Sequence, residues 1–207
     1  MFGLRKGSVA AAVCIASLAA TGNVLAQDDG GWTVRVGAHY VDPKSNNHNL
    51  VAVDSGESLT FSATYRYTPR WAVEILGALP FSHDVTLKAS GAKVAEVKHL
   101  PPTVTMQYAF SPDRRVRPYA GIGVNATLFF DEDTTGALAS DDLSLDTSFG
   151  LAAQFGLDID IGENLILGLD ARWIDIDSDA KLNGSALGSV EIDPVVFGLT
   201  FGWRLGR

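Results

Sequence analysis

Four histidines are the residues of this chain with the clearest capacity for acid–base or metal chemistry: His39, His48, His83 and His99. A hydrolytic site needs a nucleophile, a general base and an orienting group within reach of one another. The histidines are spread over separate segments, and the sequence has no Gly-x-Ser-x-Gly and no histidine pair at metal-site spacing. We therefore predict no catalytic site, metal or cofactor. We expect His39 to form hydrogen bonds inside the fold and His99 to lie at a rim.

Carboxylates crowd two later segments, where they could hold a hard cation such as Ca²⁺, which prefers oxygen ligands. The same residues also keep an exposed loop solvated, and their spacing matches no EF-hand loop. Solvation is the favoured interpretation. The residues concerned are Asp131, Glu132, Asp133, Asp141 and Asp142 in the first segment, and Asp175, Asp177 and Asp179 in the second.

The elements that would carry these groups are set by an alternation of apolar and polar residues, as in the run from Leu59 to Tyr67. A strand points successive side chains to opposite faces, so each such run has one apolar and one polar face. The alternation recurs in residues 32–40, 59–67, 71–79, 103–110, 119–128, 145–159, 165–174 and 195–204. With no helix-period segment between them, these eight runs predict an all-β fold. We expect an eight-stranded antiparallel transmembrane β-barrel, apolar toward lipid and polar toward its lumen.

The connections between these runs alternate in length. Residues 68–70, 111–116 and 162–164 are short connections, whereas residues 42–56, 81–99, 131–142 and 177–189 are long ones. Outer-membrane barrels have short periplasmic turns and long extracellular loops. An amino terminus in the periplasm places every connection on the side that this rule requires.

The first residues have the pattern of a secretory signal peptide. Arg5 and Lys6 precede an apolar run too short to span a bilayer, and small residues at positions 24 and 26 precede a cleavage point. We predict a signal peptide at 1–26 and an outer-membrane barrel at 27–207. Cleavage removes Cys14, the one cysteine, so the mature chain forms no disulfide. The net charge of −8 makes nucleic acid a poor partner.

A soluble ligand-binding barrel, whose apolar face points inward, is the competing architecture. Aliphatic and large aromatic residues occupy nearly all of one face, while glycine, serine, threonine and charged residues are spread along the other. The aromatic residues also gather near both strand ends, with Trp71 and Tyr108 at the short-turn end and Phe81 at the other. Amphipathic rings favour the headgroup level of a membrane, which favours the membrane barrel.

The inward-facing residues divide by height into a charged set and an apolar set. We expect the charged set to form a lumen plug of ion pairs, because unpaired charges in so narrow a lumen are costly. The plug set is Arg35, Arg66, Glu74, Asp158, Asp170, Arg172 and Arg204. The apolar set predicts a substrate channel in the upper lumen, and comprises Val41, Leu76, Phe129, Ile174, Ile176, Ile192 and Val196.

Proline residues at the extracellular strand ends suggest a weak point in the wall. A hydrophobic solute that enters the funnel cannot cheaply cross a charged plug, so its exit would be sideways. Proline donates no backbone hydrogen bond. We therefore hypothesise a lateral seam between residues 71–79 and 103–110, with strand termination as an equally good interpretation. The prolines are Pro80, Pro101, Pro102 and Pro194.

Two blocks carry a more specific signal. The first block is His99-Leu100-Pro101-Pro102-Thr103-Val104 together with the following run Arg117-Pro118-Tyr119-Ala120-Gly121-Ile122-Gly123-Val124-Asn125. The second block is Asp170-Ala171-Arg172-Trp173-Ile174-Asp175-Ile176. They resemble the outer membrane protein W family, which includes the AlkL-type alkane importers. The resemblance covers the whole predicted mature chain and implies an outer-membrane barrel with an apolar channel for small hydrophobic molecules. One departure is the end of the chain, Leu205-Gly206-Arg207, where such barrels usually have an aromatic residue.

The expected function is passage of small hydrophobic molecules from outside into the outer membrane, through the upper lumen and a lateral exit. The alternative is a structural or surface-interaction barrel, such as a receptor for phage, toxin or host, without transport. An unfilled upper lumen would favour the first. The expected partners are outer-membrane lipid and lipopolysaccharide, small hydrophobic solutes and the barrel-assembly machinery. No oligomerisation motif is evident, so a monomer is expected.

Overall fold

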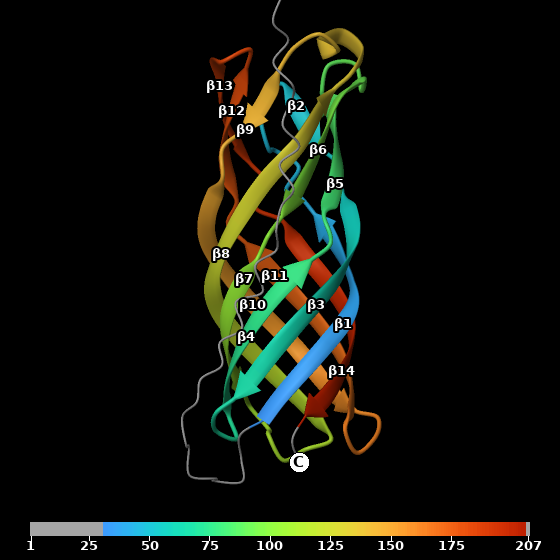
Figure 1. Cartoon of the computed structure of the whole chain (residues 1–207), viewed down its shortest axis with the longest axis vertical. Coiled ribbons are helices and arrows are strands. Elements are labelled where there is room, and N and C mark those ends of the chain that lie inside the picture. The colour runs from blue at the N-terminus through green and yellow to red at the C-terminus, as the bar shows by residue number, and fades with distance from the viewer. Residues whose placement is uncertain (1–30, 206–207) are drawn as a thin grey trace, which may run out of the picture.

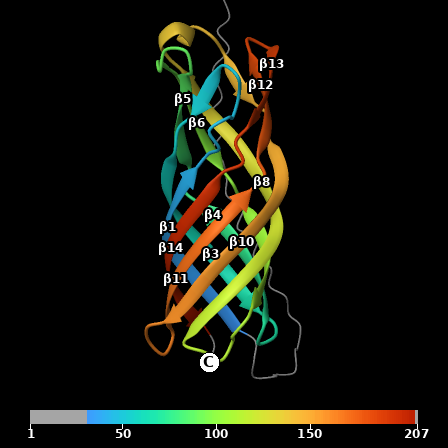
Figure 2. The same ribbon diagram turned by 180° about the vertical axis from the view of Figure 1, so that it is seen from behind.

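A closed antiparallel β-barrel forms the body of the molecule in a computed structural model that describes residues 31–205 (Figures 1 and 2). Each wall strand pairs with the next, and the last pairs with the first through the register Val34↔Trp203. The wall strands are β1 (Gly31–Asp42), β3 (Gly56–Arg66), β4 (Trp71–Ala78), β7 (Thr103–Ala109), β8 (Val116–Thr134), β10 (Ser148–Asp160), β11 (Leu165–Ile174) and β14 (Val195–Leu205). These eight strands confirm the predicted fold.

Shorter strands continue the wall beyond one end of the barrel, at the top of Figure 1. We call this the long-loop end and the opposite one the tight-turn end. The strands are β2 (Val51–Val53), β5 (Phe81–Leu87), β6 (Lys93–Leu100), β9 (Leu143–Leu145), β12 (Asp177–Leu182) and β13 (Ser185–Glu191), with a 3₁₀ turn at Gly136–Leu138. No helix within residues 31–205 is long and apolar enough to cross a membrane.

Two of the predicted long loops are therefore β-hairpins, β5–β6 and β12–β13. The turn of the second is Asn183-Gly184, and both residues have positive φ, 50° and 78°. This conformation belongs to a two-residue hairpin turn that Asn-Gly favours. The Asn-Gly dipeptide is visible in the sequence, and the long connection predicted at 177–189 is ordered as this hairpin.

The alternation of side chains follows the predicted faces along the wall strands. Ile122 is 74% exposed and Phe149 80% exposed on the outer surface, where lipid would cover them. Aromatic pairs lie outside the tight-turn end, with ring centroids 5.0 Å apart for Trp32–Tyr65 and for Trp71–Tyr108. An apolar exterior with aromatic rings at its end is the arrangement of a membrane barrel, not of a soluble one.

The alternation changes phase at Pro80. Leu79 and Pro80 are both exposed, and Phe81 is only 2% exposed and points inward. The expectation that Phe81 belongs to the outer aromatic girdle was therefore wrong. Proline interrupts a strand ladder, and here it separates β4 from β5 and restarts the inward–outward order one residue late.

Candidate functional site

An ion pair between β1 and β10 closes the lower lumen. Nη1 and Nη2 of the Arg35 guanidinium donate to Oδ1 and Oδ2 of Asp158, each at 2.9 Å. Their side chains are 7% and 4% exposed. Such a bidentate pair satisfies both buried charges and fixes the distance across the barrel.

A second group of charges lies higher in the lumen and is centred on Arg172 of β11. Its guanidinium is 3.0 Å from a Glu74 oxygen and donates from Nε to Asp170 at 2.6 Å. His39 lies 3.4 Å from the same Asp170 carboxylate and is hydrogen-bonded through Nδ1 to Thr60 at 2.7 Å. His39 is thus placed inside the lumen, and the residues Glu74, Asp170 and Arg172 are brought into one network.

Neutral side chains complete this plug. Glu74 accepts hydrogen bonds from Ser62 at 3.0 Å and from Gln107 at 3.1 Å. Gln107 also donates to Gln154, which donates to the Tyr119 hydroxyl. Passage of an apolar solute through this buried network is costly in free energy, because it would break the hydrogen bonds between these polar groups.

The tight-turn end of the plug differs from expectation. Arg204 pairs with Asp160, and so does Arg117 through two hydrogen bonds, although neither Arg117 nor Asp160 was predicted to take part. Arg66, by contrast, forms no carboxylate pair within residues 31–205 and donates to the Pro69 carbonyl at 3.1 Å. Its placement in the ion-pair network was wrong, because β3 ends at Arg66 and the side chain bends toward the following turn.

Above the plug lies an apolar cavity. Five of the predicted channel residues line it: Val41, Leu76, Ile174, Ile176 and Val196. Ala78, Phe81, His99, Pro101 and Pro194 complete the walls, and His39, Thr60 and Arg172 form the floor. Phe129 and Ile192 were wrongly predicted as lining. Ile192 belongs to the buried apolar cluster of the upper lumen and Phe129 packs against that cluster, but neither lines the cavity.

The cavity is narrow. Its volume is about 20 Å³, room for between one and two water molecules at about 10–15 Å³ each. The atoms that face it are apolar. A solute larger than water therefore enters only if side chains of the surrounding cluster move. The upper lumen is neither a wide funnel nor a fully packed core.

One side of this cavity meets a gap in the wall. The ladder between β4 and β7 ends at Leu76↔Thr103, and pairing resumes above it at Phe81↔His99. No backbone hydrogen bond joins residues 77–80 to residues 100–102. Because Ala78 and Pro101 both line the cavity, the gap borders it directly.

Pro80, Pro101 and Pro102 lie in this gap, but Pro194 does not. Pro194 precedes β14, and its carbonyl accepts a hydrogen bond from Ile174 at 3.2 Å. Pairing is continuous there between β11 and β14 and between β1 and β14. The assignment of Pro194 to the lateral seam was wrong, because β14, which follows it, is hydrogen-bonded to both of its neighbouring strands, β1 and β11.

Two histidines stack inside the β5–β6 extension. The ring centroids of His83 and His99 are 5.0 Å apart, and each ring makes a further contact. His83 Nδ1 donates to the Asp54 carbonyl at 2.6 Å, and His99 packs on Phe81 and Phe129. His99 is 4% exposed, so the expectation of a rim residue was wrong. Burial, with a smaller effect of His83, lowers the pKa of His99 to about 3.

This low pKa predicts an acid-sensitive extension. Between pH 6.5 and about 3 the unfolded chain binds a proton at His99 and the folded chain does not. Folding stability is therefore lost as the pH falls, by about 1.4 kcal/mol for each pH unit below 6.5. We expect His99→Phe to retain more stability than the unmodified barrel between pH 7.5 and 5.0 in urea unfolding. An identical pH dependence of the two proteins would contradict the buried neutral state of His99.

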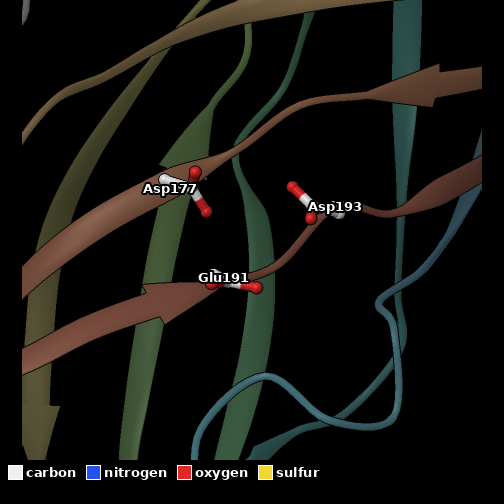
Figure 3. Close-up of side chains that lie close together, drawn as sticks. All are labelled: Asp177, Glu191 and Asp193. Carbon is white, nitrogen blue, oxygen red and sulfur yellow. The ribbon is translucent and has the colours of Figure 1, made fainter.

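Three carboxylates meet outside the barrel, at the base of the β12–β13 hairpin (Figure 3). Oxygens of Asp177, Glu191 and Asp193 lie within 4.8 Å of one another. The Lys44 ammonium pairs with Glu191 and lies 2.8 Å from Asp193, so this lysine already balances part of the negative charge of the three carboxylates. Burial, followed by the charges of Asp193, Asp175 and Glu191, raises the pKa of Asp177.

The closed wall, the apolar exterior and the plugged lumen define the chain as a small outer-membrane β-barrel protein. A model of the OmpW family matches residues 28–205. Outer membrane protein W of Escherichia coli (strain K12) is 35% identical, over 92% of this chain and 97% of the relative. The chain belongs to the OmpW family and is a protein of the Gram-negative outer membrane. Its tight-turn end therefore faces the periplasm and its long-loop end the exterior.

Solved structures agree with this assignment. The crystal structure of OprG from Pseudomonas aeruginosa has a TM-score of 0.77 and 32% identity, covering 86% of this chain and 97% of that one. Outer membrane protein AlkL in lipid bilayers has a TM-score of 0.67 and 25% identity, covering 90% and 95%. The predicted signal peptide at 1–26 lies outside the described residues.

Proposed function

We propose that this barrel passes small hydrophobic molecules from outside the cell into the outer membrane. The observation that carries the proposal is the apolar cavity that lies directly above a paired, charged plug. Transfer of apolar surface from water into the cavity is favourable by about 25 cal/mol per Å². The plug opposes further descent, so the solute would leave sideways into lipid.

The gap between β4 and β7 supports a lateral exit. It borders the cavity, it has no ladder hydrogen bond, and Pro80, Pro101 and Pro102 have no amide hydrogen with which to close it. Widening there breaks fewer hydrogen bonds than at any continuous strand pair.

The remaining parts of the proposal concern partners. The apolar exterior would contact outer-membrane lipid, and the long-loop end lipopolysaccharide. The barrel-assembly machinery would insert the chain, and the barrel would act as a monomer that catalyses no reaction. A structural or surface-interaction barrel is the alternative, and it requires no movement of the cavity walls.

Uptake of a medium-chain alkane into vesicles tests the proposal. Ile174→Asp together with Val196→Asp places two carboxylates on neighbouring strands of one cavity wall, which draws water into the cavity and removes its affinity for apolar solute. We expect uptake to fall by roughly tenfold or more, since each 1.4 kcal/mol is about a factor of ten. Ile174→Leu with Val196→Leu is the matched control and keeps most activity.

Both variants must fold, which heat-modifiable gel mobility checks. Uptake by the unmodified barrel no faster than by empty vesicles would overturn the proposal. Equal uptake by the folded aspartate variant would show that the solute does not pass through this cavity.

A further inference from the structure

The positively charged residues of the barrel are separated along its axis by residue type. Six arginines lie at the tight-turn end: Arg66, Arg70, Arg114, Arg115, Arg117 and Arg204. The lysines of the described residues, such as Lys44, Lys93 and Lys181, lie instead at the long-loop end. In a chain with a net charge of −8, this collection of arginines is a local excess of positive charge that the plug does not use fully.

Three of these arginines line one polar pocket at the tight-turn end. Arg66, Arg70 and Arg117 surround it together with Gln107, Tyr119 and Asp158. The cavity measures about 10 Å³, room for about one water-sized group such as a single oxygen atom. Arg70 is exposed at the rim, so the pocket can be reached from the periplasm.

Two of the three guanidinium groups have donors left over. Arg66 donates from Nη1 to the Pro69 carbonyl at 3.1 Å. Arg70 donates from Nη1 to the Phe110 carbonyl at 3.1 Å and to the Tyr108 hydroxyl at 3.4 Å. Within residues 31–205 neither group forms an ion pair, whereas Arg117 and Arg204 share Asp160. A guanidinium has five N–H donors, so most of those on Arg66 and Arg70 are free to bind a ligand.

Positively charged neighbours outnumber negatively charged ones around Arg66. Asp158 attracts its charge, while Arg35, Arg117 and Arg204 repel it. The Asp158 carboxylate is already held by two hydrogen bonds from Arg35. An additional anion placed between Arg66 and Arg70 would relieve this repulsion and occupy the remaining donors.

We propose that Arg66 and Arg70, with Arg117 behind them, form a binding site for a phosphate-type oxyanion. The planar fork of arginine matches two oxygens of such an anion, and one oxygen fits the pocket. Arg70 lies against Tyr108, whose ring contacts Trp71 at the level where aromatic residues meet headgroups. Both a phospholipid headgroup of the inner leaflet and a soluble phosphate can therefore reach the site. This proposal is independent of solute uptake.

Arginine side-chain NMR tests the site residue by residue. The barrel is held in maltoside micelles, which contain no phosphate, and inorganic phosphate replaces chloride at constant ionic strength. We expect the Nε–Hε signals of Arg66 and Arg70 to shift in a saturable manner, and that of Arg114 to stay in place. Arg114 is the matched control because it is exposed at the same end without lining the pocket.

Two variants then distinguish binding at this site from diffuse electrostatic attraction of the anion to the tight-turn end. Arg70→Gln, at an exposed position, is expected to weaken phosphate binding by roughly tenfold through loss of charged hydrogen bonds. Arg114→Gln is expected to leave it unchanged. Equal weakening by the two variants, or equal shifts of Arg66, Arg70 and Arg114, would overturn the site in favour of diffuse attraction.

The source of the anion is decided by a lipid arm. Nanodiscs of phosphatidylglycerol without added phosphate should produce the same Arg66 and Arg70 shifts if the headgroup is the ligand. Shifts that require inorganic phosphate even in nanodiscs would identify a soluble anion. If neither source shifts these two signals, the proposal is wrong.

Discussion

Replacement of Arg172 by alanine is expected to lower the free energy of unfolding of the barrel by about 3–5 kcal/mol. The guanidinium is 4% exposed and contacts both Glu74 and Asp170. The Glu74 and Asp170 side chains are only 2% and 3% exposed, and removal of Arg172 leaves their carboxylates without their main cation. Urea unfolding in lipid vesicles, followed by the fluorescence of outward residues such as Trp173, measures the loss.

Two controls define what the loss means. Lys181→Ala removes an exposed pair with Asp146 at 2.6 Å and should cost about 1 kcal/mol or less. Glu74→Gln, Asp170→Asn and Arg172→Met together remove all the charges of the group and should recover much of the stability. A loss from Arg172→Ala no larger than that from Lys181→Ala would show that the plug is penetrated by water and is not a paired, buried layer.

Much of the barrel could be predicted because a strand has a period of two and a membrane enforces it. Every lipid-facing position must be apolar, so the faces of segments such as 195–204 follow from the sequence alone. The prediction failed where a local feature broke the period. At Pro80 the order restarts one residue late, which moved Phe81 from the expected exterior into the cavity.

The partners within the plug were harder to predict than its composition. Arg35 and Asp158 are 123 residues apart, and they meet only because β1, β14, β11 and β10 are adjacent with one particular register. Alternation gives the face of each residue but not the stagger between neighbouring strands. The contribution of Asp160 was missed for the same reason, since two arginines from different strands converge on it.

The seam was predicted from proline residues, and this signal is ambiguous. Pro80, Pro101 and Pro102 lie beside unpaired backbone, while Pro194 lies in a wall that is hydrogen-bonded on both sides. Proline removes one donor, but whether the ladder opens depends on the neighbouring strand's own donors. The size of the cavity was likewise beyond the sequence, because residue identities do not report the space between side chains.

The second large effect concerns the gap between β4 and β7. Ala78 lies within the gap and faces the cavity, where it is partly buried. Ala78→Trp adds a bulky ring at this point and is expected to block lateral exit without changing the plug. Alkane uptake should fall by roughly tenfold, since a steric clash of a few kcal/mol suffices for that factor. Ala153→Trp is the matched control, because Ala153 faces lipid on β10.

The rate of alkane uptake by Ala78→Trp, compared with Ala153→Trp in vesicles of the same composition, is the most direct test of the account. Equal amounts of folded protein are first established by gel mobility. The account predicts uptake near that of empty vesicles for Ala78→Trp and near that of the unmodified barrel for Ala153→Trp. Uptake by Ala78→Trp as fast as by the unmodified barrel would contradict a route from the apolar cavity through this gap into the membrane.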